Sequence, residues 1–404
     1  MVSIFFCLLL CAVCLALVAP IIVIAVQILV AALQKPRDWR GLDPLPFAGR
    51  PPIAIIVPAH NESSAVAKTI ESLKSQMSPD DRLLVVADNC TDDTAAQALK
   101  HGATVVERHN LLLRGKGHAL DHGWKTLSTD ARFALFLCVD ADCVVHPGAV
   151  NELARKATAT GRPVQALYLI LNEGLTSVRQ RVSEFAYIVK GLVRPVGFDR
   201  LGLPCQLGGS GMMFPRALLE QQSLASGHLV EDLLLGLTLC EKGSAPVFCD
   251  TAYVTSTFPV ETGSQESQRT RWEHGHLSVI VQVLPRLLAR SIARLDLNLF
   301  AQALDAAVPP VTLLLLLQTA AVVASAVFLI LSGLSAPLWI AGTGLVALFA
   351  TLVLAWTQFG RERLSGKDLV QASLYIAWKF PLYIRYLFAR QTEWVRTKRD
   401  ASKD

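Results

Sequence analysis

The residues that could do chemistry in this chain are acidic side chains that follow short apolar segments. Asp140 and Asp142 directly follow the run Phe-Ala-Leu-Phe-Leu-Cys-Val, with one residue between them. Two carboxylates held side by side repel each other. A hard divalent cation such as Mg²⁺ or Mn²⁺ removes that cost, because it takes oxygen ligands and usually shares them with substrate phosphates. The pair therefore predicts a site for a metal ion and a diphosphate.

Two more polar segments follow apolar runs earlier in the chain. They are residues 58–62 (Pro-Ala-His-Asn-Glu) and 88–94 (Asp-Asn-Cys-Thr-Asp-Asp-Thr). Asn and Asp often cap helices, and we expect that role for Asn61 and Asp92. The three segments together nevertheless indicate one shared ligand site.

The segment Arg-Gly-Lys-Gly at residues 114–117 leaves two interpretations open for Lys116. It is either a phosphate contact or part of a solvated turn. Neither a Gly-x-x-x-x-Gly-Lys-Ser/Thr loop nor a Gly-x-Gly-x-x-Gly turn follows the first apolar run, so ATPase and dinucleotide-cofactor chemistry lack their usual signal.

The elements that must position these groups alternate between strands and helices. Short β-branched runs predict strands at residues 53–57, 83–87, 104–106 and 133–139, and helical patterns lie between them at residues 63–77, 92–100 and 117–127. This alternation predicts an α/β domain with a mostly parallel sheet, in which ligands bind outside the carboxyl ends of the strands. The polar segments lie at those ends.

The composition adds a membrane component to this domain. Of 404 residues, 52% are hydrophobic and 18% charged, whereas soluble proteins have about 45–50% apolar and about 25% charged residues. A net charge of +5 without a block of Lys and Arg among aromatics argues against nucleic-acid binding and fits contact with anionic membrane lipids. The nine cysteines form no framework, as expected of reduced thiols.

Three segments are long and apolar enough to cross a bilayer. Residues 3–33 carry no charge, and residues 306–360 suit two spans, 306–332 and 337–360. Basic residues follow each membrane region: Lys35, Arg37, Arg40, Arg361, Arg363 and Lys367. By the positive-inside rule, we expect the N-terminus outside and both the central domain and the C-terminus in the cytoplasm.

Two other stretches have the mixed character of helices at the membrane surface. Residues 276–294 carry Arg286, Arg290 and Arg294 four residues apart among Leu and Val, and residues 369–390 mix aromatic, basic and aliphatic side chains. The second stretch could also span, but we expect it to lie in the membrane plane. The predicted organisation is an anchor at residues 1–40, a cytoplasmic catalytic domain at 41–275, and surface helices with a transmembrane hairpin at 276–404.

The polar segments resemble the motifs of membrane-bound family 2 glycosyltransferases, which have the GT-A fold and include cellulose, chitin and hyaluronan synthases. The resemblance covers about residues 53–272, and the motifs occur in the family's order. The matching segments are residues 57–62 (Val-Pro-Ala-His-Asn-Glu), Asp88, Asp140-Ala-Asp142, 208–214 (Gly-Gly-Ser-Gly-Met-Met-Phe), 230–232 (Val-Glu-Asp) and 268–272 (Gln-Arg-Thr-Arg-Trp). Val230 departs from the family, which has Ser or Thr there, and this puts fine positioning of the acceptor in doubt.

The resemblance implies a role for each of these residues. A nucleotide-sugar, expected to be a UDP-sugar, would be bound by Pro58, Glu62, Asp88, Lys116 and Asp140. The metal, Mg²⁺ or Mn²⁺, would be held by Asp142 and Asp140. Asp232, next to Glu231 at the start of a helix, would be the general base. Acceptor or diphosphate contacts would come from Gly209, Ser210, Gln268, Arg271 and Trp272.

The implied reaction is an inverting single displacement on a lipid-linked or glycan acceptor, in bacterial exopolysaccharide or cell-surface glycan synthesis at the inner membrane. A processive synthase that polymerises and exports a β-linked glycan is the alternative. The Gln-x-x-Arg-Trp segment favours it, whereas the count of three spans favours single transfer unless partner subunits complete a channel. A non-catalytic scaffold is disfavoured, because all the expected carboxylates are present.

Overall fold

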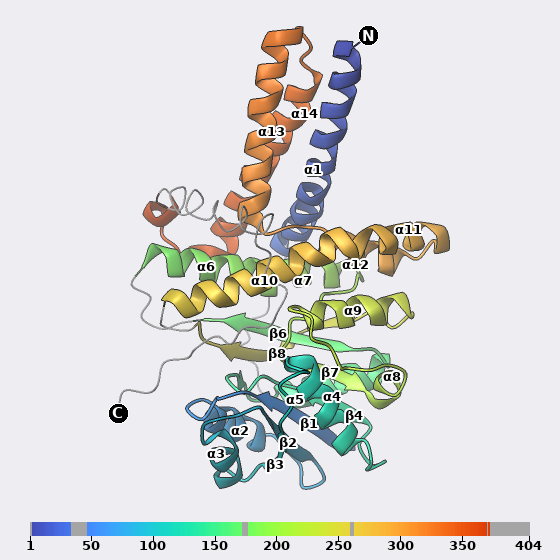
Figure 1. Cartoon of the computed structure of the whole chain (residues 1–404), viewed down its shortest axis with the longest axis vertical. Coiled ribbons are helices and arrows are strands. Elements are labelled where there is room, and N and C mark those ends of the chain that lie inside the picture. The colour runs from blue at the N-terminus through green and yellow to red at the C-terminus, as the bar shows by residue number, and fades with distance from the viewer. Residues whose placement is uncertain (1, 34–46, 172–176, 259–261, 370, 372–404) are drawn as a thin grey trace. The chain divides into compact units, whose positions relative to one another are not determined.

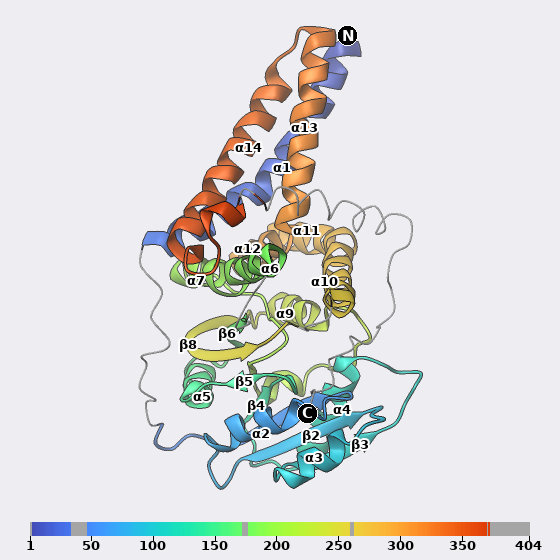
Figure 2. The same cartoon turned by 90° about the vertical axis from the view of Figure 1, so that its left-hand side faces the viewer.

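A computed structural model describes residues 2–33, 47–171, 177–258, 262–369 and 371, and its elements are drawn in two views (Figures 1 and 2). It divides into two compact units. Of the described residues, the sheet unit comprises those within 36–173 and 203–275, and the helical unit comprises those within 1–35, 174–202 and 276–390. The segment 174–202, which the sequence analysis included in residues 41–275, thus groups with the helices.

One eight-stranded sheet forms the sheet unit, in the order β3-β2-β1-β4-β7-β6-β8-β5. Its strands are β1 (Ile53–Ala59), β2 (Arg82–Asp88), β3 (Thr104–Arg108), β4 (Leu135–Cys138), β5 (Val144–Val145), β6 (Val164–Ile170), β7 (Met212–Pro215) and β8 (Val247–Ser256). The first four are the predicted strands, and they pair in parallel. β6 and β8 are also parallel, whereas β7 and β5 run antiparallel to their neighbours. The predicted α/β class is confirmed.

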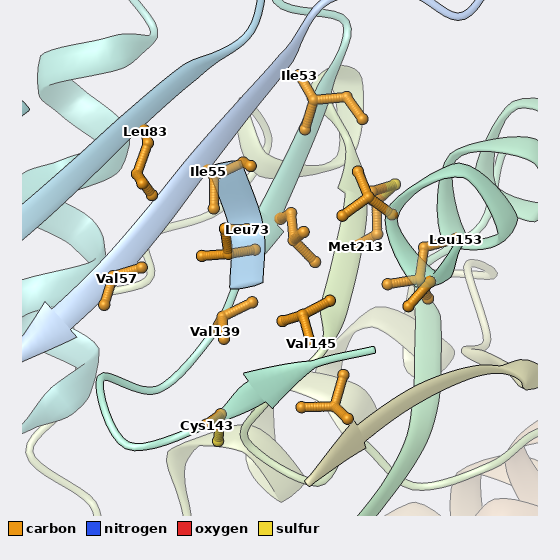
Figure 3. Close-up of a cluster of buried hydrophobic side chains, with 14 of the residues drawn as sticks. Ile53, Ile55, Val57, Leu73, Leu83, Val139, Cys143, Val145, Leu153 and Met213 are labelled. Atoms are coloured by element: carbon orange, nitrogen blue, oxygen red, sulfur yellow. The ribbon is translucent and has the colours of Figure 1, made fainter. Parts of the chain in front are cut away.

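Helices cover both faces of this sheet. They are α2 (Val66–Lys74), α3 (Thr94–Lys100), α4 (Lys116–Leu127), α5 (Ala149–Thr160), α8 (Arg216–Leu219) and α9 (Glu231–Glu241). Successive side chains of a strand point to opposite faces, so Ile53, Ile55 and Val57 of β1 join a core with α2 and α5 (Figure 3). Ala54 and Ile56 join a second core with α4 and α9.

The strand register brings the predicted polar segments to one edge of the sheet. Ala59 of β1 is paired with Ala87 of β2, and Ile56 is paired with Cys138 of β4. Parallel strands end at the same edge, so the residues that follow β1, β2 and β4 emerge together. α4 packs tightly against the strands here, because a β-carbon on Gly123 would lie 2.6 Å from Ile56 Cγ2.

Three helices in the described part of the helical unit are long and apolar enough to span a membrane. They are α1 (Val2–Leu33), α13 (Val311–Ser332), and α14 (Ala336–Ala355) continued by the π-helix η3 (Trp356–Gly360). The prediction that the second span begins at residue 306 was wrong. Residue 306 ends α12 (Leu297–Ala306), and Pro309 and Pro310 separate it from α13, because proline lacks an N–H and disfavours helix before it.

Three further helices of this unit are α6 (Val178–Ile188), the π-helix η2 (Val189–Val193) and α7 (Arg194–Arg200). A buried polar network links α1, α7 and α12. Gln27 donates to Asp305 Oδ1 at 2.5 Å, and Arg194 donates to Gln27 Oε1 at 2.9 Å and to Asp305 Oδ1 at 2.7 Å. Each polar group in the network has a partner, so the high cost of burying it unpaired is avoided.

The predicted surface helix at residues 276–294 is two helices. α10 (Thr262–Gln282) and α11 (Leu284–Arg294) meet at Val283, and Pro285 stands in the first turn of α11, where its missing N–H costs nothing. The stretch predicted to lie at the membrane surface is therefore helical but divided at Val283. The expected in-plane helix at 369–390, and the basic residues Lys35, Arg37 and Arg40, lie outside the described residues apart from 369 and 371.

Candidate active site

The segments that follow β1 and β2 are hydrogen-bonded to each other. Asn61 Oδ1 accepts from the Thr91 backbone N–H at 2.6 Å, and the Glu62 N–H donates to Thr94 Oγ1 at 2.8 Å. The N-cap of α3 is Asp93 and not the predicted Asp92, whose carboxylate lies one residue earlier and accepts from the Thr94 N–H at 3.0 Å. Asn61 is not the cap predicted for it, because α2 begins after Ala65 and Asn61 instead joins the two loops. Glu62 therefore lies at this edge in a loop held by hydrogen bonds, whereas Pro58 lies near the end of β1, paired with Val86 of β2.

Asp88 ends β2 and is 6% exposed. Its Oδ1 pairs with Arg108 Nη1 at 2.5 Å, and Arg108 also donates to the Leu113 carbonyl at 2.8 Å. Arg108 is not predictable from the sequence, because an arginine at a strand end belongs to no motif. The pair fixes the carboxylate at the edge where a donor nucleotide would lie.

Asp140 and Asp142 follow β4 at the centre of the same edge. Asp140 is ion-paired with Lys116, the first residue of α4, and its backbone N–H donates to Ser210 Oγ at 3.1 Å. Burial raises the pKa of Asp140; Lys116 opposes this and Asp142 adds to it. Burial would lower the pKa of Lys116, but Asp140, Glu231 and Asp232 raise it above its ordinary value. Lys116 therefore lies inside the acidic cluster and not in a solvated turn.

The donor atoms here suit a hard divalent cation. Among the described residues, Asp140, Asp142 and Cys143 form the one group of three or more possible ligands whose ligand atoms all lie within 4.8 Å of one another. Burial, followed by the charges of Asp142 and Asp140, raises the pKa of the Cys143 thiol well above its usual range. A protonated thiol is a poor ligand for Mg²⁺ or Mn²⁺, whereas two carboxylates are good ones.

A glycine-rich loop, Gly208–Gly211, passes beside this pair and leads into β7. The Gly209 carbonyl accepts from Lys116 Nζ at 2.7 Å. Gly209 has φ +91°, and a β-carbon there would lie 3.1 Å from Asp232 Oδ2 and 3.4 Å from Lys116 Nζ. Only glycine fits so close an approach with a positive φ. The loop thus joins the acidic pair to the start of α9.

Glu231 and Asp232 form the first turn of α9. Asp232 Oδ1 accepts from the Leu233 N–H at 2.8 Å, which leaves Oδ2 facing Gly209. Burial, followed by the charge of Asp232, raises the pKa of Glu231 to about 7, while Lys116 opposes the shift. Val230 precedes them at the N-cap position, and its side chain makes no capping hydrogen bond. It packs instead against α10, where a β-carbon on Gly275 would lie 2.9 Å from Val230 Cγ1.

Gln268, Arg271 and Trp272 lie on α10 within the same unit. Their spacing of three and four residues places them on one face of the helix, and all three are partly buried. Gly275, one turn further on, contacts Val230 as described. The predicted acceptor-side residues are therefore on a helix that packs against the segment carrying the candidate base.

The structure thus brings Lys116, Asp140, Gly209, Ser210 and Asp232 into direct or near contact. Asp142 lies next to Asp140, and Glu62 and Asp88 lie at the same edge of the sheet. Two residues that the sequence analysis missed also belong here, the buried Cys143 and the buried Gln165 of β6. A single Cys or Gln in an apolar strand region has no motif that would have identified it.

This arrangement can carry out a displacement at a carbon bearing a diphosphate leaving group. Lys116 and a cation on the two carboxylates would face the departing negative charge, and Asp232 would accept a proton from an attacking hydroxyl. A mixed α/β sheet with acidic groups at one edge, an Asp-x-Asp pair and a carboxylate opening a helix defines the class of nucleotide-sugar transferases.

Residues 51–275 match the family described as glycosyltransferase like family 2. A segment of 101 residues is 37% identical to protein RfbJ of Shigella flexneri and covers 25% of this chain and 72% of RfbJ. A segment of 122 residues is 28% identical to the hyaluronan synthase of Streptococcus pyogenes, covering 27% of this chain but only 28% of that enzyme. The fold matches a mannosyltransferase of Pyrobaculum calidifontis, solved with GDP-mannose and Mn²⁺, with a TM-score of 0.52 at 17% identity over 95% of this chain and all of the other.

The chain belongs to glycosyltransferase family 2, and its sheet unit has the GT-A fold. The expected enzyme class and fold are both confirmed.

Proposed function

We propose that this enzyme transfers one sugar from a nucleotide-sugar, a UDP-sugar, to a lipid-linked acceptor at the cytoplasmic face of a bacterial inner membrane. The reaction would be an inverting single displacement in cell-surface glycan synthesis. Asp88, Glu62 and Pro58 would contact the nucleoside, and Lys116 and Asp140 the diphosphate. The acceptor would lie against Gly209, Ser210, Gln268, Arg271 and Trp272.

One observation carries the proposal: Asp232 faces Gly209 and Lys116, and Lys116 is paired with Asp140. The carboxylate that would take the acceptor proton is therefore within a few atoms of the group that would face the leaving diphosphate. An inverting displacement requires these two functions on either side of one reacting carbon. Asp232 accepts a single backbone hydrogen bond on Oδ1, which holds the side chain in place.

A divalent metal, Mg²⁺ or Mn²⁺, is part of the proposal. Asp142 and Asp140 would hold it, and when bound it would supply positive charge to the diphosphate oxygens. The protein's own contribution is to keep Asp140 oriented through Lys116 and Ser210 Oγ. The Mn²⁺ in the related mannosyltransferase structure supports this assignment by analogy.

Processive polymerisation with export is the second candidate, and the Gln-x-x-Arg-Trp segment on α10 favours it. A channel for a polymer needs several lining helices, whereas the described residues hold three apolar helices long enough to span. Single transfer is therefore preferred, and a processive enzyme would require helices from partner subunits.

The test is release of nucleoside diphosphate by the detergent-purified full-length protein. A panel of UDP- and GDP-sugars would be supplied with a bacterial lipid extract, with and without Mn²⁺ or Mg²⁺. Metal-dependent release with one donor, lost in Asp232→Asn, is the expected result. The product's mass then separates the two candidates: one added sugar supports single transfer, and a ladder of sizes supports the processive enzyme. Absence of release with every donor and both metals would overturn the proposal.

A further inference from the structure

Gln165 is a buried residue of β6 that no motif includes, and its side chain is fully engaged beneath the glycine-rich loop. It is 4% exposed. Its Oε1 accepts from the Gly208 N–H at 2.7 Å, and its Nε2 donates to the Ser210 carbonyl and the Ala166 carbonyl, both at 2.9 Å. One amide therefore holds both ends of a three-residue segment.

The place of this amide in the sheet explains why it is needed. β6 and β7 pair antiparallel at Val164 with Met213 and at Gln165 with Met212, and this pairing ends there apart from a hydrogen bond from the Ala166 N–H to the Gly211 carbonyl at 2.9 Å. Beyond it the chain turns through Gly209 and Gly211, which both have positive φ. Backbone groups buried in such a turn need partners. The Gln165 side chain supplies them where the strand ladder no longer does.

The loop that Gln165 holds contacts three charged residues of the candidate reaction centre, Lys116, Asp140 and Asp232. The Gly209 carbonyl receives Lys116 Nζ, and Gly209 closely approaches Asp232 Oδ2. Ser210 Oγ accepts from the Asp140 N–H at 3.1 Å and donates to Cys143 Sγ at 3.1 Å. Cys143 in turn lies 3.7 Å from Asp142 Oδ1.

We propose that Gln165 is a positioning residue for sugar transfer. By fixing loop Gly208–Gly211, it sets the distance between the base Asp232 on one side and the Lys116–Asp140 pair on the other. It touches neither donor nor acceptor and acts only through the loop. The inference rests on the proposed function, because it assigns Asp232 and Lys116 to the two sides of one reacting carbon.

The experiment compares Gln165→Leu and Gln165→Glu with wild type in the full-length protein. Leu removes all three hydrogen bonds, whereas Glu keeps the acceptor for the Gly208 N–H and loses the donors to the two carbonyls. We expect kcat to fall about 10–100-fold in Gln165→Leu, the size of effect expected when a catalytic geometry shifts by about 1 Å. The kcat of Gln165→Glu should fall less than that of Gln165→Leu. Affinity for the nucleoside diphosphate, measured by calorimetry, should not change.

Gln76 provides a matched control in the same unit. Its Nε2 donates to the Ser72 and Val145 carbonyls, both at 3.0 Å, so it also clamps backbone. Gln76 lies just after α2, which packs on the face of the sheet that carries Val164 and Ala166. Gln165 lies between these two residues on β6, so its side chain points to the opposite face. Gln76→Leu should lose a similar amount of thermal stability while keeping the wild-type kcat.

Equal kcat losses in Gln165→Leu and Gln76→Leu, after correction for folded protein, would overturn the positioning role. So would a loss confined to nucleotide affinity. If Gln165→Leu does not fold, the kcat and the nucleotide affinity of Gln165→Glu are compared with those of Gln76→Leu in the same way. Failure of the proposed function is distinct, because it would appear as absence of transfer by the wild-type protein.

Discussion

The two carboxylates after β4 have different surroundings, and this difference predicts different consequences of changing them. Asp140 is ion-paired with Lys116, whereas Asp142 lies beside the protonated Cys143 thiol. Asp142→Asn should therefore weaken Mn²⁺ binding while leaving the Lys116–Asp140 ion pair in place. We expect turnover to fall about 100-fold or more, because a bound cation contributes several kcal/mol of charge stabilisation.

The measurement for Asp142→Asn is Mn²⁺ titration by calorimetry alongside turnover. Asp130→Asn is the control, since Asp130 pairs with Arg132 in a turn before β4, away from the cluster. Equal Mn²⁺ affinities in the two variants would contradict the metal assignment.

The buried carboxyl of Glu231 should make the folded protein less stable as the pH rises. Burial and Asp232 raise the pKa of this carboxyl from about 4.5 to about 7 in the folded protein. The folded state then binds more protons than the unfolded state between these values, so stability is lost as pH rises through about 7. Glu231→Gln should therefore melt higher than wild type at pH 8, by a few degrees, and little higher at pH 5.

The melting temperatures would be followed by calorimetry of the metal-free protein. Glu241→Gln, at the other end of α9, is the matched control and should show no such pH-dependent difference. A Glu231→Gln protein that melts at the wild-type temperature at pH 8 would show that the carboxyl is not destabilised by burial.

At the scale of single residues, the sequence predicted the groups that fall in short motifs and missed those that act through geometry. Asp140, Asp142 and Asp232 were identified, and Lys116 was left between two interpretations. Gln165 and Arg108 were missed, because their roles depend on which backbone or carboxylate lies opposite them after folding. Asn61 was assigned to a helix cap, but its partner is in a loop 30 residues away.

Among the elements, the contact of α9 with α10 explains the valine at position 230. Where the family has a hydroxyl residue, Val230 instead fills the space over Gly275. Gly275→Ala would bring a β-carbon to 2.9 Å from Val230 Cγ1 and 3.0 Å from Leu229 Cβ. We expect a loss of about 1–3 kcal/mol, typical of overpacking a core, and reduced turnover because Glu231 and Asp232 follow directly.

The double variant Val230→Ala with Gly275→Ala tests this contact. Removing the valine methyl groups should relieve the clash, so the two changes together should cost less than their sum by about 0.5–3 kcal/mol. Denaturant melts and turnover of the four proteins complete the cycle. Additive effects would mean that α9 and α10 do not meet at these residues.

The hairpin of α11 and α12 predicts an interaction with anionic lipid. Arg286, Arg290 and Arg294 are exposed, as are Ile292 and Leu295, and α12 ends four residues before the membrane helix α13. Such a surface should attract anionic headgroups by about 1 kcal/mol per basic residue. Arg290→Gln with Arg294→Gln should therefore retain less phosphatidylglycerol in mixed micelles, measured by mass spectrometry. Arg132→Gln in the sheet unit should retain as much as wild type, and equal retention in all three proteins would refute the assignment.

The element pattern itself was largely readable from sequence. The strands β1 to β4 and the helices between them were predicted, because β-branched runs and helical periodicity are local signals. The differences fell at prolines: Pro285 divides a predicted surface stretch, and Pro309 and Pro310 shorten a predicted span. Strands β5 to β8 were not predicted. Their pairing is antiparallel in part and joins residues far apart in the chain, for which no local pattern exists.

For the whole molecule, the three apolar helices and the basic residues beside them predict one orientation. A short turn without charge, residues 333–335, joins α13 to α14, whereas Arg361, Arg363 and Lys367 follow η3. Basic residues are retained on the cytoplasmic side, so the 333–335 turn should lie outside and the sheet unit inside. Nucleotide-sugars are cytoplasmic substrates, and the proposed chemistry requires the same placement. Alkaline phosphatase, which is active only outside the cytoplasm, should be active when inserted at Gly333 and inactive when inserted at Gly161, an exposed turn of the sheet unit. The reverse pattern would place the acidic edge of the sheet outside the cell, and the donor would then have to be something other than a cytoplasmic nucleotide-sugar.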